Sequence, residues 1–132
     1  MKAVLRDKVF MRLLAQSGHD LPVLAQLTYE ADDPYAVRVG FLHDGLLAAE
    51  WRLSREMLAE GMRGEVGIGD VRMWPHLNGS REELRIELLR SAVFTVWAPS
   101  LRKFLDRTYE EVPAGQERLE LDAFLAEVLA AG

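Results

Sequence analysis

Apolar and polar residues alternate with a period of two over most of the first half of the chain. In residues 21–31, one face holds four apolar side chains, Val23, Ala25, Leu27 and Tyr29. Such alternation is typical of a strand with one buried face. The same pattern predicts strands over residues 4–14, 35–41 and 46–53. In the first of these, Val9, Met11 and Leu13 share a face, and Phe10 lies between Lys8 and Arg12 on the other.

Turn signals separate these predicted strands. Asp44-Gly45 is a strong signal for a two-residue hairpin. It predicts that the strands on either side pair with each other. The inner face of the third strand is expected to hold Tyr35, Val37, Val39 and Phe41. In the fourth strand, the same alternation places on one face the side chains of Leu47, Ala49, Trp51 and Leu53.

The spacing of apolar residues changes after residue 53, from the alternation of a strand to the spacing of a helix. A short helix is predicted over residues 54–61, with Ser54 as its N-cap and Gly61 at its end. Three further strands are predicted over residues 67–75, 84–88 and 92–98. The last has apolar residues on both faces, which is typical of a strand covered on both sides. The second cover would come from a helix or from another subunit.

Two helices are predicted at the end of the chain. The first begins at Pro99 or Ser100 and ends near Glu111. The second, over residues 121–131, is expected to bury Leu121, Phe124, Leu125, Val128 and Leu129. The complete pattern predicts one α+β domain over residues 1–132, with a mostly antiparallel β-sheet of about seven strands followed by C-terminal helices.

Composition narrows the class of protein. The 132 residues are 49% apolar and 28% charged, as in ordinary soluble domains. No run approaches the roughly 20 apolar residues of a membrane-spanning helix, so we expect no membrane insertion and a cytoplasmic protein. The net charge of −5 does not favour nucleic-acid binding, which needs clustered Lys and Arg. The absence of cysteine excludes disulfides and thiolate metal sites.

The sequence contains no recognisable catalytic constellation. The three histidines, His19, His43 and His76, lack the spacing of a metal site. No serine stands in a nucleophile elbow. Asp70 has the one unusual setting among the acids, and an Asx-type bond to its own turn explains it better than catalysis does. We therefore expect no metal, no cofactor and no enzymatic activity.

The least interchangeable segment is Gly67–Pro75. Its two glycines, Gly67 and Gly69, predict a glycine-kinked or bulged strand that delivers Trp74 to a surface or to the core. As a phosphate signal the segment is weak, because the third glycine, the lysine and the following helix are missing. We take Gly67, Gly69, Asp70 and Trp74 as the candidate partner-binding residues, since tryptophan is enriched in interface hot spots. A core position for Trp74 and a stacking platform for single-stranded nucleic acid are the alternatives.

Several motifs occur in a recognisable order along the chain. The first group comprises Leu21-Pro22-Val23, Tyr29, Asp33–Arg38 and Phe41. The second comprises Glu50–Leu58, Gly61 and Gly67–Pro75. The third comprises Phe104–Thr108, Val112-Pro113, Gly115, Glu117 and Asp122. In this order and spacing, the chain resembles the SsgA-like family of sporulation and cell-division regulators of filamentous actinobacteria.

The resemblance implies a small cytoplasmic protein without known enzymatic activity that acts where septa form. One branch of the family recruits FtsZ, the tubulin-like division GTPase, and others act on septum-site localisation or wall synthesis. The resemblance also implies a Whirly-like fold and a homotrimer. A single-stranded nucleic-acid-binding Whirly-like protein is the alternative function. Residues 89–97 depart from the family pattern by lacking its Pro-x-Gly hairpin, so Phe94 and Trp97 are candidates for a variant interface.

Overall fold

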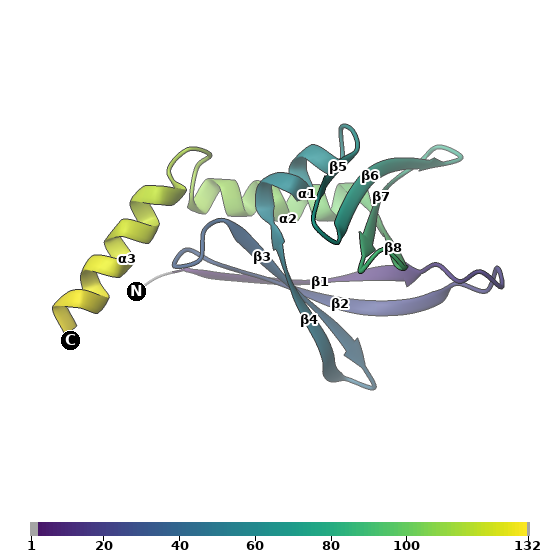
Figure 1. The fold of residues 1–132 in the computed structure, drawn as a ribbon, viewed down its shortest axis with the longest axis horizontal. Coiled ribbons are helices and arrows are strands. Elements are labelled where there is room, and N and C mark those ends of the chain that lie inside the picture. The colour runs from purple at the N-terminus through teal and green to yellow at the C-terminus, as the bar shows by residue number, and fades with distance from the viewer. Residues whose placement is uncertain (1–2, 132) are drawn as a thin grey trace.

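Residues 3–131 are described by a computed structural model. They form one antiparallel sheet of eight strands and three helices (Figure 1). The spatial order of the strands is β4-β3-β2-β1-β8-β7-β6-β5. The strands are β1 (Val4–Leu13), β2 (Leu21–Glu30), β3 (Ala36–His43), β4 (Leu46–Ser54), β5 (Val66–Ile68), β6 (Val71–Asn78), β7 (Arg81–Leu88) and β8 (Ala92–Trp97). The helices are α1 (Arg55–Gly61), α2 (Ala98–Glu111) and α3 (Glu117–Ala131). The predicted α+β class is confirmed.

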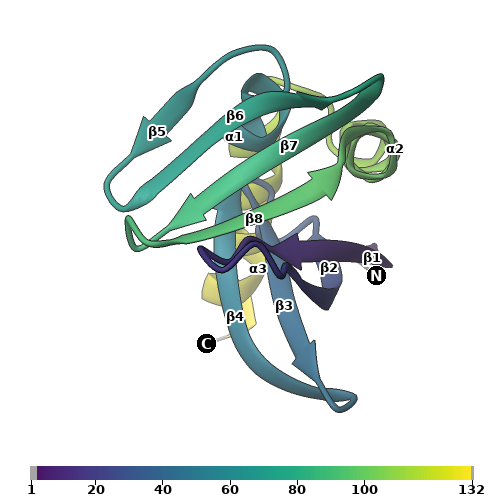
Figure 2. The same ribbon diagram turned by 90° about the vertical axis from the view of Figure 1, so that its right-hand side faces the viewer.

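The sheet consists of two halves that share a narrow junction. β1 pairs with β2 along its whole length, but it pairs with β8 only at Met11, Arg12 and Leu13. Figure 2 shows the half formed by β5–β8 turned across the half formed by β1–β4. The curled sheet therefore encloses its own core, and α1 and α2 lie against what we call its inner face.

The strand count is eight rather than seven because the segment Gly67–Pro75 is not one strand. Ile68 pairs with Val71, so the chain reverses at Gly69 and Asp70 and forms the β5–β6 hairpin. Gly69 has a φ of +58°. A glycine with positive φ at the first turn position suits a two-residue hairpin. The prediction of a kinked or bulged single strand is wrong, because the glycine makes a reversal instead.

Helices α1 and α2 form where the sequence predicts them and bury apolar side chains against the sheet. Ser54 caps α1, since its hydroxyl accepts a hydrogen bond from the amide of Met57 at 3.1 Å. Gly61 ends α1 in close contact with β6 and β7, where a Cβ would lie 2.9 Å from Met73 Cβ. The apolar stripe of α2 faces the core with four buried side chains, Leu101, Phe104, Leu105 and Thr108.

The inner-face residues of β2 are confirmed, and those of β3 and β4 need two corrections. Tyr35 precedes β3 and is exposed. Leu47 lies on the outer face, because the register shifts between Phe41 and Leu42 and pairs Leu42 with Leu47. A bulge of one residue moves every later side chain to the opposite face. Leu47 therefore covers Gly40, where a Cβ would lie 2.7 Å from Leu47 Cδ1.

The last helix does not bury its apolar residues, so that prediction is wrong. α3 has no buried residue, and Leu129 is 80% exposed. Figure 1 shows α3 leaving the end of α2 and running away from the sheet. Leu121, Phe124, Leu125 and Val128 share one side of the helix, but apolar residues such as Leu119 also lie on the opposite side. Within residues 3–131 no element packs on either side closely enough to bury a side chain.

Buried Arg55 holds the corner from which α3 departs. Its Nη1 donates hydrogen bonds to the carbonyls of Thr108 at 3.0 Å and Val112 at 2.8 Å, near the end of α2. Its Nη2 lies 3.5 Å from Glu117 Oε2, at the start of α3. The guanidinium also lies 4.0 Å from the ring centroid of Tyr109. One side chain therefore connects all three helices.

Candidate protein-binding surface

The β5–β6 hairpin carries all four candidate residues, but they do not form one cluster. Gly67 and Gly69 have backbone roles. A Cβ at Gly67 would lie 3.1 Å from Arg72 Cγ and 3.2 Å from the carbonyl oxygen of Val71. Only Asp70 and Trp74 contribute side chains, and they lie at different levels of the hairpin. The two glycines therefore shape the backbone of the hairpin.

Asp70 takes part in two contacts with the β7–β8 turn. Its backbone carbonyl accepts a hydrogen bond from the amide of Leu89 at 2.9 Å. Its Oδ1 lies 3.4 Å from Arg90 Nε, with both side chains largely exposed. The expected Asx-type bond to its own turn is not formed, because the carboxylate reaches this neighbouring turn instead. An exposed pair of this kind contributes little to stability.

The departure from the family pattern at residues 89–97 still produces a hairpin. Leu89 and Arg90 have φ of +56° and +59°. Few residues other than glycine adopt this left-handed region. The backbone therefore makes the turn with two unfavourable side chains, and the amide of Ser91 closes it on the carbonyl of Leu88 at 3.2 Å.

Trp74 is half-buried on the outer face of β6. It lies opposite Arg85 of β7, while its neighbour Met73 is fully buried on the inner face. The guanidinium of Arg72 lies 5.1 Å from the centroid of the indole ring. Arg72 is itself paired with Glu65 and, at 3.5 Å, with Glu87. The hydrogen bond and charge of Glu65 raise the pKa of Arg72. Trp74 is thus a surface aromatic positioned by a fixed cation.

A second tryptophan repeats this arrangement on β8. Trp97 is 44% exposed, and the guanidinium of Arg81 lies 5.4 Å from its ring centroid. Phe94 points the other way, into the core, where its ring stacks on Phe41 at 4.5 Å. Of the two residues considered for a variant interface, only Trp97 is at the surface.

The face between these tryptophans contains a buried carboxylate. Glu83 lies opposite both His76 and Trp97, and Arg12 and Arg81 donate to its Oε2 at 3.0 and 3.2 Å. Burial alone raises the pKa of Glu83, but the hydrogen bond and charge of Arg12, together with Arg81, outweigh it and leave the pKa below its ordinary value. Sequence reasoning missed this cluster, because Arg12 and Glu83 are 71 residues apart.

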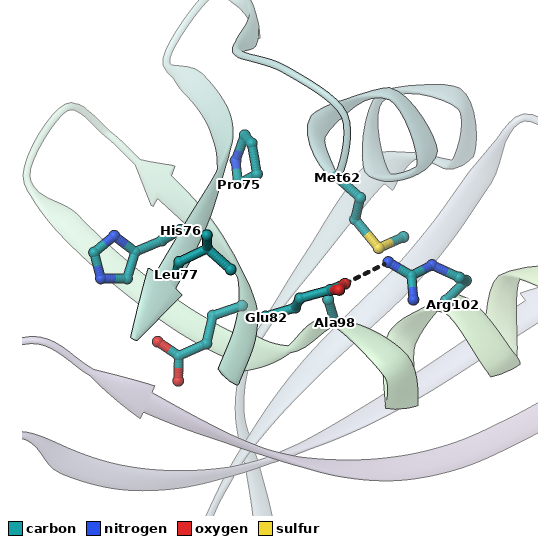
Figure 3. Close-up of a pocket in the computed structure, with 8 residues that line it drawn as sticks. Met62, Pro75, His76, Leu77, Glu82, Ala98 and Arg102 are labelled. Carbon is teal, nitrogen blue, oxygen red and sulfur yellow. Dashed lines mark hydrogen bonds and ion pairs between the residues drawn. The ribbon is translucent and has the colours of Figure 1, made fainter. Parts of the chain in front are cut away.

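A groove of about 550 Å³ lies where β6 and β7 approach the helices (Figure 3). Met62 and Ala98 line it from the helix side, and residues 75–77 of β6 line it from the other side. Its rim holds an ion pair between Arg102 Nη2 and Glu82 Oε2 at 3.2 Å. Trp74 does not line the groove, but the next residue, Pro75, does. Strand β6 therefore contributes to two surfaces, the outer face that carries Trp74 and the groove lined by Pro75.

The histidines stay apart in the structure. His19 is exposed in the loop between β1 and β2, His43 is exposed at the end of β3, and His76 lies at the groove. Among residues 3–131 there is no group of three His, Cys, Asp or Glu side chains that could hold a metal ion. No helix in the same residues is long and apolar enough to cross a membrane. The surface carries the rings of Trp74 and Trp97, each beside an arginine guanidinium, and Trp and Arg are enriched in the hot spots of protein interfaces.

Comparison with known proteins agrees with this fold. Residues 23–117 match the family model described as Streptomyces sporulation and cell division protein, SsgA. The sporulation-specific cell division protein SsgB of Thermobifida fusca is 39% identical, and the match covers 92% of each chain. SsgB of Streptomyces coelicolor is 36% identical, and the match covers 98% of each.

Solved structures show the same relationship. The crystal structure of an SsgA-like sporulation-specific cell division protein from Thermobifida fusca superposes with a TM-score of 0.92 at 36% identity, covering 99% of this chain and 97% of the other. A structure of SsgB from Streptomyces coelicolor superposes with a TM-score of 0.84 at 35% identity, covering 91% and 97%. Both sequence and fold therefore place the chain in the SsgA family of sporulation and cell division proteins.

Proposed function

We propose that this protein is a non-enzymatic adaptor that localises or activates the septum-forming machinery during sporulation. The observation that carries the proposal is the surface around Trp74, on a chain whose relatives are named sporulation-specific cell division proteins. A tryptophan held under a paired arginine on a sheet face resembles the hot spots of protein interfaces, where Trp and Arg are enriched. The function is then recognition, and the surface itself is the functional site.

The Trp74 surface combines a rigid anchor with a shaped backbone. Arg72 fixes one side of the indole, and the turn at Gly69 and Asp70 ends the same hairpin. A partner that buries Trp74 would also contact Asp70 or Arg90 at the hairpin end. We propose FtsZ as the first candidate partner, with septum-site proteins as the second. Both assignments follow from the family resemblance and not from the geometry.

We also propose that the adaptor works as a homo-oligomer, with a trimer as the expected form. Several copies of one weak surface bind a polymeric partner more tightly than a single copy does, because later contacts become intramolecular. The exposed apolar side chains of α3 support this proposal, since nothing within residues 3–131 buries them.

The test is the position of the protein in sporulating cells. A fluorescent fusion of this chain should form regularly spaced bands at future septa, coincident with labelled FtsZ. The same fusion carrying Trp74→Ala should be present in equal amount but lose the bands. A wild-type fusion spread evenly through the cell during septation would contradict an adaptor role at septa.

One observation favours a second function, single-stranded nucleic-acid binding. Phe10 is 77% exposed on the outer face of β1, beside the cationic side chains of Lys8 and Arg6. Exposed aromatics beside cations on a sheet are used as stacking platforms. Titration with a labelled oligonucleotide at low salt tests this function, and absence of any shift would remove it.

A further inference from the structure

Four apolar side chains form a continuous row across the outer face of β1–β4. The register places Phe10 opposite Leu24, Leu24 opposite Leu42, and Leu42 opposite Leu47. We call these four residues the outer row. Its two end residues are the most accessible, with Phe10 77% and Leu47 58% exposed. Three steps between strands give the row a length of about 14 Å.

One side of the outer row is positively charged. Lys8 and Arg6 precede Phe10 on the same face of β1. Neither side chain forms an ion pair within residues 3–131, whereas Arg38 on the same face is paired with Glu30 at 2.5 Å. Glu50, the acid at the level of Lys8, lies three strands away on β4. The row and its flank therefore suit an apolar segment that carries negative charge on one side.

Helix α3 has the matching chemistry. The positions of Leu121, Phe124, Leu125 and Val128 follow the i, i+3, i+4, i+7 spacing of one helix face. These four residues form the α3 stripe, which extends about 10 Å along the axis. Glu120 and Glu127, seven residues apart, lie along one flank of the stripe. No residue of α3 is buried in its own chain.

We propose that α3 of one copy lies along the outer row of a second copy. The α3 stripe covers the outer row, and Glu127 faces Lys8. This inference deepens the proposed homo-oligomer and rests on it. The two contact surfaces are different parts of the chain, so the interface is head-to-tail, and a closed ring forms if the rotation between copies permits it.

Light scattering of purified variants tests the arrangement. Wild type should have a mass that is a multiple of 14.9 kDa, and both Phe10→Asp and Leu125→Asp should reduce it to 14.9 kDa. Both side chains are exposed in the single chain, so circular dichroism and thermal unfolding should remain as in wild type. Leu119→Asp is the matched control, because Leu119 lies on the opposite side of α3 and its replacement should leave the mass unchanged.

Mixing the two monomeric variants distinguishes a head-to-tail interface from a symmetric contact between two α3 helices. Phe10→Asp retains an intact α3, and Leu125→Asp retains an intact outer row. The mixture should therefore form a complex of two copies, although neither variant assembles alone. A charge exchange adds a second test: Lys8→Glu and Glu127→Lys should each weaken assembly, and the double variant should recover it.

Three results would overturn the inference in different ways. A monomeric wild type at high micromolar concentration would remove both the inference and the proposed homo-oligomer, while septal localisation would still be judged by microscopy. An oligomer that survives Phe10→Asp would remove this interface alone. Loss of oligonucleotide binding in Phe10→Asp with no change of mass would assign the outer row to nucleic acid instead of a second copy.

Discussion

Arg12 of β1 and Glu83 of β7 form an ion pair of 3.0 Å across the junction between the two halves of the sheet. The Glu83 side chain is almost completely buried, whereas that of Arg12 is 41% exposed. β1 and β8 share three residue pairs and a hydrogen bond from the amide of Leu14 to the carbonyl of Val93 at 2.9 Å, and this side-chain contact adds to them.

We expect Glu83→Gln to destabilise the fold. The substitution removes the charge that Arg12 and Arg81 share, while leaving a buried amide in its place. Hydrogen bonds to charged groups contribute about 1.5–3 kcal/mol each, and the neutral amide weakens two of them, so the free energy of unfolding should fall by at least about 1.5 kcal/mol. Urea unfolding at neutral pH measures it. Glu82→Gln, on an exposed neighbour paired with Arg102, should change it by less than about 0.5 kcal/mol.

The same pair predicts a pH dependence. The folded-state pKa of Glu83 is below its ordinary value of 4.5, since its hydrogen bonds with Arg12 and Arg81 outweigh the effect of burial. The ionised carboxylate therefore stabilises the fold fully above about pH 4.5. This contribution is lost as the pH falls through the folded-state pKa. The difference in unfolding free energy between wild type and Glu83→Gln should shrink below pH 4.5, and a constant difference would show that ionisation is not its cause.

Gly61 should be intolerant of a methyl group. Gly61→Ala would place a Cβ 2.9 Å from Met73 Cβ and 3.2 Å from Leu84 Cδ1, both in the buried core. Overpacking of this kind typically costs about 1–3 kcal/mol. Gly64→Ala is the matched control, because no atom lies within 4 Å of the added Cβ. Equal midpoints of thermal unfolding for the two variants would show that the packing around Gly61 has room for a methyl group.

Replacing Arg90 by glycine should stabilise the protein. Arg90 has a φ of +59°, and the left-handed region costs a residue with a side chain roughly 1–2 kcal/mol. Its ion pair with Asp70 is exposed and contributes little. Arg90→Gly should therefore raise the midpoint of thermal unfolding, whereas Ser91→Gly, at a residue without positive φ, should not. A lower midpoint for Arg90→Gly would show that the pair with Asp70 outweighs the strain.

Strand positions and faces were predictable wherever one face is buried and no bulge intervenes. The alternation in β2 correctly placed Ala25, Leu27 and Tyr29 in the core. Leu47 was placed on the wrong face, because a bulge between paired strands leaves no mark in the sequence of either strand. The apolar stripe of α3 was also visible, but periodicity shows that a face is apolar and not which surface covers it.

The candidate surface was predictable only in part. The run Gly67–Pro75 singled out the glycines and the tryptophan, which are local signals, but it predicted one distorted strand where the structure has the β5–β6 hairpin. The Arg12–Glu83 pair and the Arg55 corner join residues far apart in the chain, which no local pattern relates. Phe10 did leave a signal that sequence reasoning did not use, because a large aromatic on the polar face of a strand is out of pattern.

Trp74→Ala should weaken partner binding without unfolding the sheet. Trp74 is half-buried under Arg72 on the outer face, so its loss leaves the inner core unchanged. Truncation of a hot-spot residue costs about 2 kcal/mol or more, which corresponds to at least roughly a 30-fold loss of affinity. Loss of the circular dichroism signal in Trp74→Ala would show that Trp74 is a core residue instead.

Co-sedimentation with polymerised FtsZ from an actinobacterium tests the adaptor role most directly. We expect wild type to enter the pellet with the polymer and folded Trp74→Ala to stay in the supernatant. Equal pelleting of Trp74→Ala and wild type would contradict the proposed surface. A well-folded wild type that never pellets would contradict direct recruitment of FtsZ and leave septum-site proteins as the partners to test.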